Sequence, residues 1–278
     1  MLIVEVNDEL IINHPAPDAF LLGIEGFSSE CYHHFSADAA LRLARQIKDQ
    51  GKGVYIDLTS MYHDQDASSL ENLIKTFSFV DGFLYHDFLV QSLIPFAKRV
   101  YYAPTYMTNL IDFNLMKEEC QYVLASPEVD FKSLKAMSSN ETWYLAFGTW
   151  EIFHSRRPLL TNYFKYRGWK NEGSVYTLKE EFRPNEEYPI IEERGTKIYL
   201  NDFYYLGREI GELRGHFLIK SFNLPVENVN AIINIYHEAL IKNDGTNILP
   251  QLQALSLHLH QGFLYQKAIL LKGDVSDE

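Results

Sequence analysis

Short β-rich runs alternate along this chain with stretches that carry apolar residues at helical spacing. This alternation predicts βα units, whose strands form a parallel sheet. Eight runs favour a closed (β/α)8 barrel of TIM type, regular or distorted, and an open doubly wound sheet is the alternative. The expected strands are Leu2–Val6, Ala19–Gly23, Gly53–Leu58, Asp81–His86, Arg99–Ala103, Gln121–Ala125, Trp143–Gly148 and Phe217–Ser221.

Helix boundary signals accompany several of the intervening stretches. Side chains that accept hydrogen bonds from free backbone N–H groups favour a helix start, and glycine favours a helix end. The signals are Ser36 as an N-cap with Gly51 as the stop, Ser68 with Glu71 as a capping box, Ser126 followed by Pro127, and Pro225 ahead of a long apolar stripe.

The chain of 278 residues fits one barrel domain, because a closed α/β barrel commonly takes this length. The regular alternation breaks at 166–201, where turn residues and alternating side chains predict an inserted β-hairpin region before the last strand. Residues 246–278 are irregular, and we expect them to form a C-terminal extension that packs on the barrel.

Charge and cysteine content exclude several classes of protein. Lysine and arginine total 25 against 37 aspartates and glutamates, and this excess of acid opposes general binding to nucleic acid or to anionic membranes. Cys31 and Cys120 form no CxxC motif, which excludes a zinc or iron–sulfur site with four cysteine ligands. The low cysteine content also favours a reducing cytosol. The N-terminal stretch has no basic region of a signal peptide, and no apolar run approaches the length of a membrane span. We therefore expect a cytoplasmic protein.

Motifs of the common enzyme classes are missing. The chain has no HExxH, no GxSxG, no GxxxxGK[ST] and no GxGxxG, so a zinc peptidase, a serine hydrolase with a nucleophile elbow and a nucleotide-driven enzyme are disfavoured. Alternate residues of a strand share a face, so His258 and His260 offer a divalent metal two ligands, but a third ligand is not visible. We expect no metal and no cofactor.

The segment from Ile152 to Asn171 carries five basic residues and no acidic one inside an acidic protein. Pro158 suits a first helical turn, so His154, Ser155, Arg156 and Arg157 would lie at the barrel rim beside a helix N-terminus that favours anions. Paired guanidinium groups there are typical of phosphate or carboxylate clamps. The alternative is a solvated cationic face that balances nearby carboxylates.

Three motifs in this order resemble the collagenase-like peptidases, peptidase family U32. They are FHSRRPLLTNYFKY, YPIIEERGTKIYLNDFYYLGREIGEL and VENVNAIINIYHEAL, and DAFLLGIEGFS, KGVYIDLTSMYHDQD, VDGFLYHD and ASPEVD fall where that family places its strand ends. The chain is most similar to short, low-cysteine members from Gram-positive bacteria. The resemblance implies a barrel and a relation to proteins that act in hydroxylation of the tRNA wobble uridine or of ubiquinone, beside the older peptidase assignment.

The resemblance also implies a set of site residues. They are His154, Ser155, Arg156, Arg157 and Asn162 after the seventh strand, Asn109 after the fifth, Glu128 after the sixth, Lys220 on the eighth, and Thr196. Family members with an iron–sulfur cluster use four cysteines after the seventh strand, and this chain has none there. The family's last strand continues with an acid, a glycine and an arginine, whereas here Lys220 is followed by Ser221, Phe222 and Asn223.

Three functions follow from these observations. The first is an RNA- or anion-binding subunit that acts with a larger, cysteine-bearing relative in tRNA wobble-uridine hydroxylation, since tyrosines and a tryptophan interleave with the cations of the basic segment. The second is a peptidase or other hydrolase with His154 or His63 as base and Glu128 or Asp57 to activate water. The third is a catalytically silent interaction subunit.

Overall fold

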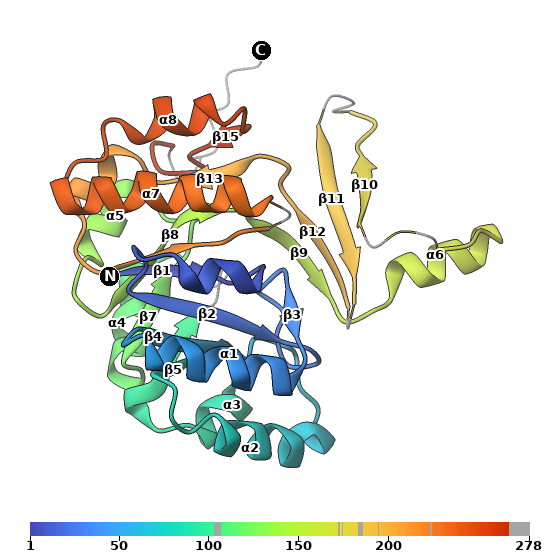
Figure 1. Ribbon diagram of the computed structural model, residues 1–278. Helices are drawn as coiled ribbons and strands as arrows, with labels where there is room; N and C mark the ends of the chain where they lie inside the picture. Colours follow the sequence, from blue (N-terminus) through green and yellow to red (C-terminus); the bar gives the residue numbers. More distant parts are fainter. Residues whose placement is uncertain are drawn as a thin grey trace.

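Eight parallel strands close into a barrel in the computed structural model, which describes residues 1–102, 107–171, 173, 175–182, 186–193, 195–222 and 224–266 (Figure 1). The strands are β1 (Leu2–Glu5), β2 (Ala19–Ile24), β4 (Gly53–Asp57), β5 (Gly82–Tyr85), β6 (Arg99–Tyr102), β7 (Tyr122–Ala125), β8 (Thr142–Gly148) and β14 (His216–Ile219). Strand β14 pairs in parallel with both β8 and β1, and this pairing closes the ring. The predicted barrel is confirmed and the open sheet is wrong. The last residue of the fifth expected strand, Ala103, lies outside the described residues.

Helices surround this ring and cover the outer faces of the strands. They are α1 (Ala37–Asp49), α2 (Ala67–Thr76), α3 (Phe88–Leu93), α4 (Leu110–Glu119), α5 (Phe131–Ala136), α7 (Val226–Lys242) and α8 (Ile248–Ala254), with short 3₁₀ turns at Glu9–Asn13, Asp64–Asp66, Phe96–Lys98 and Arg208–Glu212. None of the helices in the described part of the chain is long and apolar enough to cross a membrane.

The predicted helix starts are right in two places and wrong in two. Ser36 caps α1 by accepting from the Ala39 N–H at 3.3 Å, and α7 begins directly after Pro225. Ser68 is no cap, because a 3₁₀ turn already leads the chain into α2 one residue earlier. The start predicted at Ser126 is also wrong: Asp130 caps α5, and its carboxylate accepts from Ser133 N at 2.8 Å.

A second, four-stranded antiparallel sheet stands beside the barrel mouth (Figure 1). Its order is β10 (Val175–Lys179), β11 (Glu187–Glu192), β12 (Thr196–Tyr199) and β9 (Glu151–Ser155), and α6 (Leu159–Arg167) leaves it between β9 and β10. The sheet begins at Glu151, just past the end of β8. His154 and Ser155, which were expected at the barrel rim, therefore lie on a paired strand of this sheet.

The chain after α7 returns to the barrel. Helix α8 packs on α7, and β15 (Leu259–His260) pairs in parallel with β13 (Phe203–Tyr205), which itself pairs antiparallel with β8.

The strand faces divide the apolar residues into two clusters, one between barrel and helices and one inside the ring. The inner cluster is apolar toward the amino ends of the strands, where Trp143 and Tyr55 meet edge to face. At the carboxyl ends the interior becomes charged, because Glu30 and Lys220 are both buried there. The polar end of a barrel of this kind is where catalytic and binding residues collect.

Candidate functional site: a cleft at the barrel mouth

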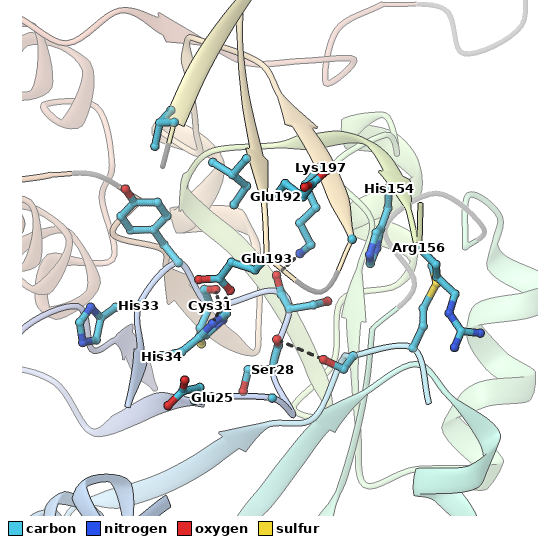
Figure 2. A pocket seen from close by; sticks show the side chains of 18 residues that line it. Glu25, Ser28, Cys31, His33, His34, His154, Arg156, Glu192, Glu193 and Lys197 are labelled. Carbon is cyan, nitrogen blue, oxygen red and sulfur yellow. Dashed lines mark hydrogen bonds and ion pairs between the residues drawn. The ribbon is translucent and has the colours of Figure 1, made fainter. Parts of the chain in front are cut away.

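A cleft of about 680 Å³ separates the carboxyl end of the barrel from the small sheet (Figure 2). The segment that follows β2 forms most of the barrel wall, with Ser60 and Met61 from the segment after β4. Strands β9, β10, β11 and β12 form the opposite wall. The cleft thus lies where barrel folds place their ligands, and a second structural unit bounds it.

Register decides which side chains of the small sheet face the cleft. Cross-strand pairing aligns one row of residues on the cleft face: Val175, Ile191, Lys197 and His154. The alternate row faces away, where Phe164 of α6 packs on Tyr176 with ring centroids 4.9 Å apart. The cleft face is therefore part apolar and part cationic.

Lys197 connects the two walls of the cleft. Its ammonium pairs with Glu151 at 2.8 Å and donates to the carbonyl of Ser29 in the barrel wall. Burial lowers the pKa of Lys197, but the charges of Glu151 and Glu30 outweigh burial and raise the pKa above its usual value. Burial raises the pKa of Glu151 to about 7, although Lys197 opposes the shift.

His154 is the neutral base of the cleft. Its Nδ1 lies 3.5 Å from Glu151 Oε1, and burial followed by the charge of Lys197 lowers the pKa of His154 to about 4. A neutral imidazole beside a carboxyl group can take a proton from a bound ligand or from water. The position predicted for this residue at the barrel mouth is therefore chemically suited to proton transfer.

Lys220 lies below the cleft, inside the ring. Its ammonium contacts the carboxylate of Glu30 at 2.8 Å, and the two side chains are only 6% and 4% exposed. Burial alone would raise the pKa of Glu30, but Lys220 and Lys197 lower it to about 2. We assign Lys220 to the stabilisation of Glu30, because its cation is already neutralised and shielded from ligands.

Asp57 shapes the barrel wall of the cleft. Its side chain is fully buried at the end of β4, and one oxygen accepts from the N–H groups of Glu30 and Cys31 at 2.9 and 2.8 Å. The other oxygen accepts from the N–H and the hydroxyl of Thr59. With four donors around it, the carboxylate holds the segment after β2 in place and has no free oxygen for activating water.

A carboxylate of this same chain, that of Glu192, binds at the N-terminus of α6. The carboxylate of Glu192 accepts from Leu160 N at 2.8 Å and from Thr161 N at 3.1 Å. Thr196, fully buried, donates to the Arg157 carbonyl and accepts from Leu159 N at 2.9 Å. The predicted anion site at this helix start is occupied, so the expectation of an external anion there is wrong.

The two arginines of the basic segment differ in setting. Arg156 lines the cleft and donates to Nε2 of His63, which lies outside the cleft lining. Arg157 is exposed, and its backbone N–H donates to the Ser155 hydroxyl at 3.2 Å. Asn162 is exposed on α6. The predicted guanidinium pair therefore does not converge on one ligand in this structure.

Three further predicted groups lie away from the cleft. Asn109 caps α4 by accepting from Asp112 N at 3.0 Å. Glu128 is half-buried after β7, where burial raises its pKa. His260 stacks on Trp150, and across the described ranges no group of three or more histidine, cysteine, aspartate or glutamate side chains is placed to hold a metal.

Comparison with known proteins bears on the fold. No family model and no curated protein matches this sequence. The solved structure of the U32 peptidase Mk0906 is similar, with a TM-score of 0.52 and 13% sequence identity over 81% of this chain and 94% of that one. The likeness is one of fold. At this identity it supports the barrel architecture that the motif resemblance implied.

Sequence reasoning missed several residues that build the cleft. Glu193 of the β11–β12 turn points toward His34 of the barrel wall (Figure 2), and the two side chains pair at 2.7 Å. Lys197 and Glu151 form the buried pair described above. The alternation of side chains along β11 and β12 does indicate which residues share a face. The register between β12 and β9, however, depends on residues about forty positions apart in the sequence.

Proposed function

We propose that this protein is a U32-type barrel protein that binds RNA through α6 and serves as a subunit, beside a larger cysteine-bearing relative, in hydroxylation of the tRNA wobble uridine. The motif resemblance and the barrel likeness support the family. The exposed surface of α6 and the residues just after it support RNA as the ligand.

Large aromatic side chains stand in solvent on α6 and just after it. Tyr166 is 85% exposed, Trp169 53% and Tyr163 49%. The Arg167 guanidinium lies 4.7 Å from the centre of the Trp169 ring. Exposed rings of this kind offer stacking platforms to unpaired bases, each worth about 1–3 kcal/mol. This cluster of rings is the observation that carries the proposal.

Cations surround the rings and remain available. Among described residues, no carboxylate pairs with Lys165, Arg167 or Lys170. Figure 1 shows α6 projecting away from the barrel, so a strand laid along it would avoid most of the acidic surface. Because the whole chain carries a net charge of −12, we expect binding to be confined to this patch.

The test is a titration of a labelled tRNA anticodon stem–loop with native protein and three variants. Tyr166→Ala/Trp169→Ala should weaken binding about tenfold or more for each base unstacked. Lys165→Ala/Arg167→Ala should reduce the slope of log affinity against log salt by about 2. The control is Lys75→Ala/Phe88→Ala on α2 and α3. Equal affinity for all four proteins would refute the proposal.

Arg157 provides a separate check within the same assay. Its side chain is exposed, so Arg157→Ala should leave the melting temperature nearly unchanged while reducing RNA affinity. The partner is sought by affinity purification of native protein and of Arg156→Ala/Arg157→Ala from the source cell. Retention of tRNA or of a cysteine-rich relative by the native protein alone supports the proposed complex.

A hydrolase is the second candidate, favoured by the contact between His154 and Glu151 in the cleft. In this function the neutral imidazole of His154 removes a proton from water while the substrate lies against the apolar residues of the small sheet. Cleavage of a peptide library by native protein and by the control His258→Gln, but not by His154→Gln, would support it. The absence of both RNA binding and hydrolysis would favour the silent interaction subunit.

A further inference from the structure

His34 has a hydrogen-bond acceptor at each of its two ring nitrogens. Its Nε2 faces the carbonyl oxygen of Cys31 at 2.9 Å, and its Nδ1 faces the carboxylate of Glu193 at 2.7 Å. A neutral imidazole carries one N–H and cannot donate to both. Only the imidazolium form satisfies the two contacts while Glu193 is ionised.

The two residues belong to opposite walls of the cleft. His34 is on β3 (His34–Phe35), which pairs with β2 of the barrel, whereas Glu193 is in the turn between β11 and β12. The His34 side chain is 11% exposed and that of Glu193 is 58% exposed. The fixed partner is therefore the barrel histidine, and the movable one is the carboxylate of the turn.

The charges and hydrogen bonds around the pair favour its charged form. Burial opposes the charge on His34, but Glu193, the more distant Asp57 and the Cys31 carbonyl together raise the pKa of His34 above 6.5. The hydrogen bond and the charge of His34, with the charge of Lys197, lower the pKa of Glu193 below 4.5 against the opposing effect of burial. Burial, followed by the charge of His34, lowers the pKa of His33, which leaves His34 as the proton carrier of the pair.

We propose that His34 and Glu193 form a proton-operated clasp that closes the cleft between the barrel wall and the small sheet, and that loss of the His34 proton releases the β11–β12 turn. The neutral ring keeps its one N–H on Nε2, where the carbonyl of the buried residue Cys31 needs a donor, so the lone pair of Nδ1 faces the carboxylate and that contact becomes repulsive. The neighbouring carboxylate of Glu192 caps α6, so release also loosens the start of that helix.

The pH range follows from the direction of each shift. The His34 contribution is complete below pH 6.5 and is lost as pH rises through the higher pKa of the folded state. The Glu193 contribution is complete above pH 4.5 and is lost as pH falls through its lower folded value. The clasp is therefore fully closed between these limits and opens as pH rises above 6.5, through the raised pKa of His34.

The experiment follows backbone hydrogen exchange of 187–193 and 195–199 between pH 5 and 9, expressed as protection factors so that intrinsic exchange rates cancel. Native protein should lose protection in one step as His34 titrates. Glu193→Gln should show low protection without that step, because the amide removes the charge and retains the shape. The matched control His33→Gln should retain the step.

A second measurement tests the clasp without relying on the size of the change in hydrogen exchange. The His34 ring is titrated by NMR in native protein and in Glu193→Gln, and its pKa should fall in the variant. A step in protection that is the same in native protein and in Glu193→Gln would overturn the clasp, as would an unchanged pKa of His34. Neither measurement uses RNA, so the clasp is tested separately from the proposed function.

Discussion

Replacing Lys220 by methionine removes the cation that balances Glu30 inside the barrel. The pair is separated by 2.8 Å, and both side chains are at most 6% exposed. Methionine matches the alkyl chain of lysine, so packing changes little while the buried carboxylate of Glu30 loses its hydrogen-bonded cation and keeps only the more distant charge of Lys197. Breaking a buried ion pair from one side costs about 3–5 kcal/mol.

The assay is thermal and urea unfolding at pH 7. For domains of this size a loss of 1 kcal/mol lowers the melting temperature by about 2–4 °C, so Lys220→Met should melt about 6–20 °C below native protein. The control is Lys135→Met, whose partner Glu212 lies at 2.6 Å but with both side chains about half exposed, and it should cost about 0–1 kcal/mol.

A double variant separates charge from packing. In Lys220→Met/Glu30→Gln the buried charge is gone on both sides, so part of the lost stability should return. If Lys220→Met is as stable as native protein, the ion pair does not stabilise the barrel. Lys220 would then regain the ligand-binding role that the sequence motif implied.

Three further predictions test the walls of the cleft. Gly23→Ala should cost about 1–3 kcal/mol in urea unfolding, since a Cβ at this position lies 2.4 Å from the His33 carbonyl oxygen; native stability would contradict this packing. Glu192→Ala removes the cap of α6 and should cost about 0.5–2 kcal/mol, seen as faster exchange at the amide of Leu160; unchanged exchange would refute the cap. Glu151 carries a pKa raised to about 7, so its contribution to stability falls as pH rises from 4.5 to 7. Glu151→Gln should therefore flatten that part of a plot of urea midpoint against pH, and an unaltered curve would exclude this carboxyl as the cause.

Much of the barrel could be predicted because its signals are local. All eight expected strands overlap observed ones, since β-branched and aromatic runs separated by amphipathic stretches need only short-range patterns. Two of the four predicted helix starts were wrong. Ser68 and Ser126 carry capping chemistry, but the preceding 3₁₀ turn and the stronger acceptor Asp130 set the actual boundaries.

The sequence predicted where the site lies better than it predicted which residues contact each other there. The basic segment that draws attention to His154 and Arg156 does contribute both residues to the cleft. Thr196, which the family resemblance implied, supports the turn before α6, and the predicted Lys220 and Asn109 prove to hold Glu30 and the start of α4. Residue type alone does not distinguish a ligand-binding cation from one that is already neutralised.

The sequence by itself determined the number of barrel strands, their parallel arrangement and the location of an unusual basic and aromatic helix. Only the tertiary structure decided which charges meet: Lys197 with Glu151, and His34 with Glu193 across the cleft. The reason is physical. Strand and helix preferences arise from neighbours a few residues apart, whereas the protonation and availability of a charged side chain depend on partners that folding brings from distant parts of the chain.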